Sequence, residues 1–129
     1  MTVIFGVGID IVSVARMKKI LSQHWADKFL RRVFASEEIV QIVRAINPEQ
    51  GFAARFAAKE ATAKALGTGF SKGIAPNQIM VVGGLGQKPV IILSSAAKTV
   101  AELNGIGNIN VSISHTAGMA CAIVVMEKI

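Results

Sequence analysis

The stretch from Gly51 to Leu66 constrains the fold of this chain more than any other segment. It is rich in alanine and is followed by Gly67 and Gly69, so a helix is predicted over its whole length. At helical spacing its small side chains form one face (Ala54, Ala57, Ala58, Ala61 and Ala65), and a second face holds Phe52, Phe56 and Ala63. A helix with two such faces is expected to be buried on two sides.

The remaining segments supply strands and shorter helices. Strands are predicted over Thr2 to Val12, Gln78 to Val82, Val90 to Leu93, Ile109 to His115 and Met119 to Glu127, with Thr116, Ala117 and Gly118 joining the last two as a hairpin. Helices are predicted after Ser13, along the stripe Val14, Met17, Leu21 and Trp25, then from Ser36 to about Ala45 and from about Ser95 to Leu103. The simplest arrangement is an α+β fold in one domain, residues 1–129, with an antiparallel sheet packed against the long buried helix.

Positive charge is concentrated in one segment of the chain. There are 14 Lys and Arg against 8 Asp and Glu, a net charge of +6. Six basic residues and one acid lie between Arg16 and Arg32, so this segment holds nearly all of the excess. Such a segment attracts nucleic acid, anionic lipid or an acidic protein, although a solvated helix face is the simpler reading.

Hydrophobicity places the chain among folded cytoplasmic proteins. With 52% hydrophobic and 17% charged residues, the composition excludes disorder. The apolar runs, such as Val3 to Ile9 and Met119 to Met126, are far shorter than the roughly 18 residues that span a bilayer. The N-terminus has no secretion-signal pattern, and the single cysteine, Cys121, is expected to be a small buried thiol in a strand. We expect a soluble cytoplasmic protein with no stable membrane insertion.

Two carboxylates stand in apolar surroundings. Asp10 interrupts the first predicted strand, and Glu60 is the only acid in the long helix. A salt bridge or helix cap explains Asp10, and an i, i+4 pair with Lys64 explains Glu60, without any ligand. However, Arg55, Lys59 and Lys64 put three cations on the same helix, and a polyanionic ligand would relieve their repulsion. Carboxylates and cations together fit a magnesium-assisted phosphate site.

Other candidate motifs are weaker. Ser114 and His115 are neighbours in a predicted strand, so they point to opposite faces and do not form a nucleophilic dyad. His115 can bind phosphate or carry a proton, or can be a structural histidine. Gly6-Val7-Gly8 lacks the third glycine and the following helix of a dinucleotide-binding motif, and no Gly-Lys-Ser/Thr phosphate loop occurs.

Three blocks of sequence carry a resemblance to a known family. Residues 6–12 read GVGIDIV, residues 55–61 read RFAAKEA and are followed by KALGTG at 64–69, and residues 111–116 read VSISHT. In order, spacing and identity these blocks resemble the holo-[acyl-carrier-protein] synthases, small trimeric members of the 4′-phosphopantetheinyl transferase superfamily. The resemblance implies the fold of that superfamily. It also implies Mg²⁺-dependent transfer of 4′-phosphopantetheine from coenzyme A to a serine of apo acyl carrier protein, which releases adenosine 3′,5′-bisphosphate and serves fatty acid biosynthesis.

The same resemblance implies roles for individual residues. Asp10 and Glu60 would be the metal ligands, and the catalytic set would be Asp10, Glu60 and Lys64, with Lys64 beside the pyrophosphate and Glu60 a candidate base acting through water. Coenzyme A contacts are implied at Arg55, Lys59, Lys64, Gly67, Ser114, His115 and Thr116. The acidic carrier protein would dock on Arg16, Lys28, Phe29 and Arg32, and the chain would form a homotrimer with active sites between subunits. At residues 86–89 the chain has GQKP, where relatives usually have an Asn-Gly-Lys-Pro-like turn.

A small basic domain that binds nucleic acid or a membrane surface without catalysis is the alternative. Nucleic-acid binding needs stacking aromatic side chains, and the chain has 5% aromatic residues and no tyrosine, so no nucleic-acid partner is expected. Membrane binding would use the amphipathic stripe Val14, Met17, Leu21 and Trp25 with its neighbouring lysines.

Overall fold

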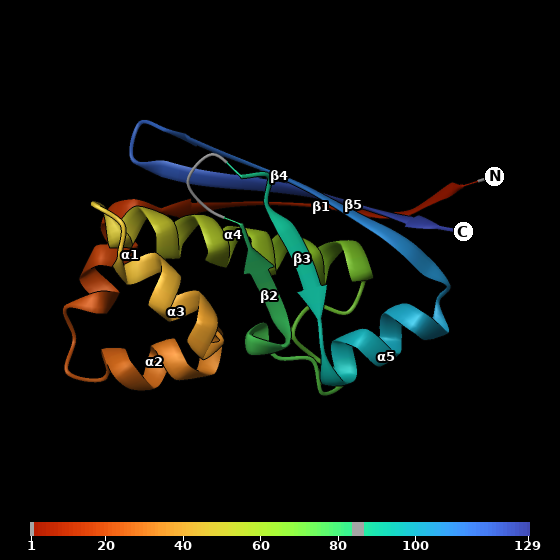
Figure 1. The fold of residues 1–129 in the computed structure, drawn as a ribbon, viewed down its shortest axis with the longest axis horizontal. Helices are drawn as coiled ribbons and strands as arrows, with labels where there is room; N and C mark the ends of the chain where they lie inside the picture. Colours follow the sequence, from red (N-terminus) through yellow and green to blue (C-terminus); the bar gives the residue numbers. More distant parts are fainter. Residues whose placement is uncertain (1, 84–86) are drawn as a thin grey trace.

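The computed structural model describes residues 2–83 and 87–129, and its centre is the long helix α4 (Pro48–Leu66). This helix packs on one face of a three-stranded antiparallel sheet in the order β1-β5-β4 (Figure 1). The strands are β1 (Val3–Ser13), β4 (Ile106–Thr116) and β5 (Met119–Lys128). A two-residue turn, Ala117 and Gly118, joins β4 to β5, and both residues have positive φ (50° and 74°), as tight hairpins require. The predicted α+β fold is confirmed.

Glycines in β1 let α4 lie directly on the strand. A Cβ atom at Gly6 would overlap the carbonyl oxygen of Ala65, and one at Gly8 would overlap that of Ala61. The alanine face of α4 meets this surface, and Ala61 is fully buried there. The Gly-Val-Gly sequence therefore serves close packing of a helix on a strand.

We expect Gly8→Ala to destabilise the protein by about 3 kcal/mol, the upper end of the usual cost of overpacking, because the atom it meets is backbone and cannot rotate away. Urea unfolding followed by circular dichroism at fixed protein concentration measures this change. Gly51→Ala is the matched control, since its Cβ would meet only the end of the Ile42 side chain, at 3.0 Å. Equal unfolding midpoints for wild type and Gly8→Ala would contradict the packing argument.

The other elements cover the two ends of α4. At one end lie α1 (Val14–Leu21), α2 (Ala26–Val33) and α3 (Ser36–Val43), which enclose a core around Phe34 and Phe52. Toward the other end lie the 3₁₀ turn η1 (Pro76–Gln78), the antiparallel pair β2 (Ile79–Val82) and β3 (Val90–Leu93), and α5 (Ser95–Leu103) (Figure 1). The second core joins these elements to the sheet.

The helices before α4 differ from the prediction. The helix after Ser13 ends at Leu21, before Trp25, and α2 is a separate helix that the sequence reading missed. The hydroxyl of Ser22 donates to the Lys19 carbonyl at 2.7 Å, so a side chain takes the place of the next turn of helix. The long helix begins at Pro48, three residues before the predicted start at Gly51, and the missing N–H of a proline costs nothing at the first position of a helix.

The sheet face opposite α4 is open in a single chain. Val7, Ile9 and Ile11 of β1 are 54%, 55% and 59% exposed, and Ile123 of β5 lies beside them in register with Ile9. In the isolated chain, β1 is therefore covered on one face only. Cys121 pairs with Ile11 on this face and is partly exposed, not buried. Within residues 2–83 and 87–129, no helix is both long and apolar enough to cross a membrane.

Candidate functional site

The free edge of β1 brings Asp10 and Lys64 together. The ammonium of Lys64 lies 3.1 Å from Oδ1 of Asp10 and donates to the Ile9 carbonyl at 2.9 Å. Both acceptors belong to β1, and Lys64 stands one turn from the end of α4. Side-chain exposure is 52% for Lys64 and 19% for Asp10, so the pair is open to solvent on the lysine side.

Glu60 lies one helical turn before Lys64, within reach of the charges of this pair. Burial raises the pKa of the Glu60 carboxyl, the negative charge of Asp10 raises it further, and Lys64 lowers it. The two carboxylates therefore lie close enough for their charges to interact. A cation placed between them would remove their repulsion.

The donor set at this edge suits a hard divalent cation. Magnesium commonly takes one or two protein carboxylates and completes its shell with water and phosphate oxygens. Asp10 and Glu60 supply that number of carboxylates, and an ammonium already occupies the cation side of Asp10. In the described part of the chain, no three His, Cys, Asp or Glu side chains gather as a ligand cluster, so an all-protein cage is not formed there.

Lys59 does not join this site. Its ammonium is fully buried and donates to Glu38 Oε1 at 2.7 Å, to the Pro76 carbonyl at 3.1 Å and to the Ile79 carbonyl at 2.5 Å. These three acceptors use all the donors of an ammonium group. Lys59 was expected to contact coenzyme A. In this structure all three N–H groups of its ammonium are bonded inside the protein, so none is left to donate to a phosphate.

Glu38 is a buried polar residue that the sequence analysis did not identify. Besides Lys59, its carboxylate accepts from the backbone N–H of Ala35 at 2.9 Å and of Val81 at 3.1 Å, and the residue is 1% exposed. Glu38 thus joins α3, α4 and β2. It also neutralises the repulsion between Lys59 and Arg55 that we assigned to a ligand: burial lowers the pKa of both groups, and the charge of Glu38 opposes that shift. No sequence motif marked Glu38, because the residue three positions before it, Ala35, lacks the side chain of a capping box.

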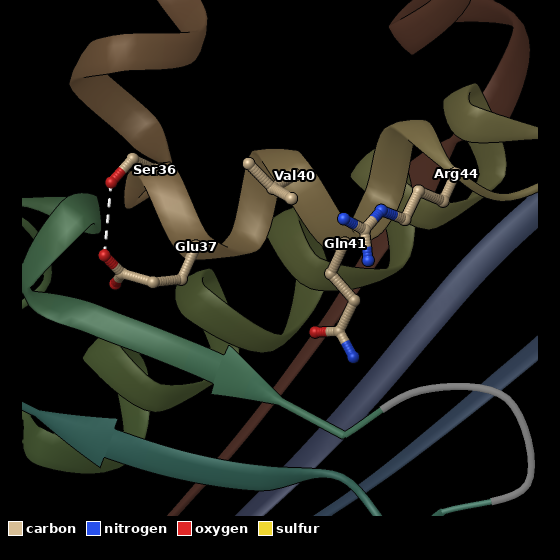
Figure 2. Close-up of a pocket in the computed structure, with 5 residues that line it drawn as sticks. All are labelled: Ser36, Glu37, Val40, Gln41 and Arg44. Atoms are coloured by element: carbon tan, nitrogen blue, oxygen red, sulfur yellow. Dashed lines mark hydrogen bonds between the residues drawn. The ribbon is translucent and has the colours of Figure 1, made fainter.

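Arg55 is buried and bonded to β2 and α3. Its guanidinium donates to the Val81 carbonyl at 2.8 Å, the Gly83 carbonyl at 3.2 Å and Gln41 Oε1 at 3.1 Å. Gln41 and Arg44 project from the same side of α3 into a shallow groove that Ser36, Glu37 and Val40 also line (Figure 2). Arg55 is therefore linked to this groove only through its hydrogen bond to Gln41, and at nine positions from Lys64 it lies on a different side of α4.

The C-terminal candidates lie on the far edge of the sheet. Strand order places β5 between β1, which carries Asp10, and β4, which carries Ser114, His115 and Thr116. The register puts His115 on the face that α4 covers and Ser114 on the open face, as expected. Among the described residues, no hydrogen bond or ion pair joins any of these three to Asp10, Glu60 or Lys64. Strand β5 therefore divides the candidate residues into two halves, with Asp10, Glu60 and Lys64 in the first and Ser114 to Thr116 in the second.

Gly67 closes α4 next to the first half. It adopts φ +86°, the left-handed conformation of a helix C-cap, and its N–H donates to the carbonyls of Ala63 and Lys64. Nothing lies within 4 Å of the place where a Cβ would stand. The turn at 86–89 is only partly described, since Gly86 lies outside the described residues.

The predicted docking residues occupy two neighbouring helices. Arg16 is exposed on α1, and Lys28 and Arg32 are exposed one turn apart on α2. Phe29 is half-buried between the rings of Trp25 and Phe56, with centroid distances of 6.4 and 6.3 Å, so it fastens α2 to α4. The charged residues form a basic surface, and the aromatic one anchors it.

The stripe proposed for membrane binding faces inward. Met17 is 1% exposed, and Val14 and Leu21 pack with it against the core below α1. Only Trp25, at 42% exposure, stays largely outside. The membrane alternative therefore lacks its apolar face.

Comparison with known proteins gives consistent matches over nearly the whole chain. A family model described as the 4′-phosphopantetheinyl transferase superfamily matches residues 6–123. A curated protein of Solibacter usitatus, named holo-[acyl-carrier-protein] synthase, is 38% identical over 125 residues, which are 97% of this chain and 99% of that protein. The solved holo-[acyl-carrier-protein] synthase of Neisseria meningitidis superposes with a TM-score of 0.88 at 33% identity, covering 98% of this chain and 100% of that one. That of Helicobacter pylori, in complex with coenzyme A, gives 0.80 at 37% identity and covers 93% and 98%.

Proposed function

This chain belongs to the 4′-phosphopantetheinyl transferase superfamily, and from that premise we propose that it is a holo-[acyl-carrier-protein] synthase. It transfers the 4′-phosphopantetheine group of coenzyme A to a serine of apo acyl carrier protein and releases adenosine 3′,5′-bisphosphate, in the cytoplasm and for fatty acid biosynthesis. The observation that carries the proposal is the cluster of Asp10, Glu60 and Lys64 at the edge of β1. Two carboxylates and a solvent-facing ammonium are the groups that transfer from a diphosphate needs.

In the proposed reaction, the serine oxygen of the carrier attacks the phosphorus that bears the pantetheine arm. The new O–P bond forms as the bond to adenosine 3′,5′-bisphosphate breaks, and the serine proton passes through water to the Glu60 carboxylate. Lys64 stabilises the negative charge on the leaving bisphosphate.

Asp10 and Glu60 would hold the magnesium ion of this enzyme. When bound there, Mg²⁺ supplies charge neutralisation on the diphosphate oxygens. The residues present fit such an ion, because Asp10 already accepts a hydrogen bond from a cation, Lys64, and the Glu60 carboxylate lies close enough for its charge to interact with both.

The site is proposed to form between copies of the chain, in a homotrimer. Two observations support this assembly: the apolar open face of the sheet around Ile9 and Ile11, and the separation of His115 from Asp10 by strand β5. Exposed apolar patches of this kind mark protein interfaces. In the proposed trimer, the β4 segment Ser114 to Thr116 of one copy meets Asp10, Glu60 and Lys64 of the next, with Gly67 beside the diphosphate.

Acyl carrier protein is proposed to dock on α1 and α2 through Arg16, Lys28 and Arg32. Their exposure and common charge suit an acidic surface. α1 follows β1 directly, so a carrier seated on it lies near Asp10.

We expect Arg16→Glu to raise the KM for acyl carrier protein by roughly tenfold or more, because a like charge then faces the acidic partner. The KM for coenzyme A stays unchanged, and steady-state kinetics with each substrate varied in turn measures both. Lys98→Glu on α5 makes the same charge reversal on an exposed residue and leaves both constants unchanged. Equal losses for both substrates in Arg16→Glu would show that the docking surface is elsewhere.

Mass spectrometry of the carrier tests the proposed reaction directly. The protein is incubated with coenzyme A, Mg²⁺ and apo acyl carrier protein, and the carrier is expected to gain the mass of one phosphopantetheine group. A chelator added before coenzyme A stops the gain. If the mass stays unchanged with several different apo carrier proteins, the proposed function is refuted.

A further inference from the structure

The lysine at the proposed metal site already occupies the place of a cation. The Lys64 ammonium bonds Asp10 Oδ1 at 3.1 Å and the Ile9 carbonyl at 2.9 Å, so two acceptors that face the site are engaged before any ligand arrives. A divalent ion that approaches Asp10 therefore meets a positive charge in contact with its ligand.

The ion pair between Lys64 and Asp10 is weak and can exchange partners. Lys64 is 52% exposed and carries a flexible stem, and a half-exposed pair of this kind contributes little stability. Lys59, one turn earlier on α4, shows the opposite arrangement: full burial and three fixed acceptors. The fold thus holds one lysine rigidly and leaves the other free to exchange partners.

We propose that Lys64 competes with the metal ion for Asp10, and that the diphosphate of coenzyme A ends this competition by accepting the ammonium. This inference rests on the proposed function. The metal and coenzyme A then bind cooperatively, since each favours the state in which Lys64 has left Asp10. Such coupling is reciprocal: the factor by which coenzyme A strengthens metal binding equals the factor by which the metal strengthens coenzyme A binding.

Binding of Mn²⁺, followed by the electron paramagnetic resonance signal of the free ion, tests the proposal without turnover. It is measured with and without saturating coenzyme A, in the absence of carrier. We expect Lys64→Met to bind Mn²⁺ alone roughly two- to fivefold tighter than wild type, the range set by a weak ion pair. In this variant, the factor by which coenzyme A strengthens Mn²⁺ binding is smaller by the same two- to fivefold. The reason is that Lys64 no longer competes with Mn²⁺ for Asp10, so coenzyme A has no competition to remove.

Lys98→Met is the control for the loss of one positive charge. Lys98 is exposed on α5, which packs against β4 and η1, and its replacement leaves both Mn²⁺ affinities at the wild-type value. If Lys64→Met strengthens Mn²⁺ binding equally with and without coenzyme A, Lys64 acts only as a fixed charge and the proposal is overturned. Unchanged Mn²⁺ affinity overturns it as well.

The variant Asp10→Asn tests whether Asp10 is a metal ligand at all, and so distinguishes a failure of the competition from a failure of that assignment. Where the assignment is right, Asp10→Asn weakens Mn²⁺ binding in both wild type and Lys64→Met. If it has no effect in either, Asp10 is not a metal ligand, and the competition is refuted together with that assignment. Transfer to the carrier, measured by mass spectrometry, tests the reaction independently of both.

Discussion

Asp10→Asn is expected to lower kcat/KM for phosphopantetheine transfer by roughly 10³-fold, while the protein stays folded. The change removes a carboxylate charge from the proposed metal site. Metal-assisted charge stabilisation contributes several kcal/mol to the transition state, and each 1.36 kcal/mol is about tenfold in rate. The amide oxygen still accepts a hydrogen bond from Lys64, so the contact between β1 and α4 survives. Carrier mass spectrometry measures the rate, and circular dichroism measures the fold.

Two further variants make this result specific. Glu60→Gln removes the other carboxylate and is expected to cause a loss of the same size. Glu102→Gln, the same chemical change on an exposed residue of α5, leaves the rate unaltered. Full activity in both Asp10→Asn and Glu60→Gln would show that the edge of β1 is not the reaction centre.

The sequence predicts most of the fold because its signals are local. Alanine content and the terminal glycines identify α4, and alternating apolar residues with a Gly-containing turn identify the β4–β5 hairpin. The break at Ser22 was not predictable, because the apolar stripe continues in phase to Trp25 while a single serine hydroxyl ends the helix. Periodicity reports which face of a helix is apolar, and it does not report where a side chain replaces the backbone as hydrogen-bond partner.

For the candidate site, the sequence singled out residues and did not give their geometry. Lys64 bonds Asp10 and Glu60 lies within reach of both charges, because a carboxylate in a strand and charges one turn apart on the covering helix share an edge. Lys59, in contrast to Lys64, is buried, because its ammonium pairs with Glu38 of α3. Adjacent positions of a helix point about 100° apart, so Lys59 and Glu60 face different neighbours. That the neighbour of Lys59 is a carboxylate, Glu38, depends on how α3 packs on α4, which the sequence pattern does not report.

The separation of Asp10 and His115 across the sheet leads to a test of the proposed assembly. Asp10→Asn and His115→Ala damage different halves of the site, which the strand order keeps on opposite edges of one chain. If sites form between copies, an intact site needs its β1 half from the His115→Ala chain and its β4 half from the Asp10→Asn chain. Random assortment in a closed ring gives such a site at about one quarter of the interfaces.

We therefore expect two variants that are each nearly inactive to regain about one quarter of wild-type activity when they are co-expressed and purified as mixed oligomers. Native mass spectrometry verifies the mixing and the trimeric mass. Asp10→Asn with Glu60→Gln is the matched control: both changes lie in the same half, so no interface in that mixture is intact and activity stays at the level of the single variants. Absence of recovery in verified mixtures of Asp10→Asn and His115→Ala would place the whole site within one chain, and the open sheet face would then need another explanation.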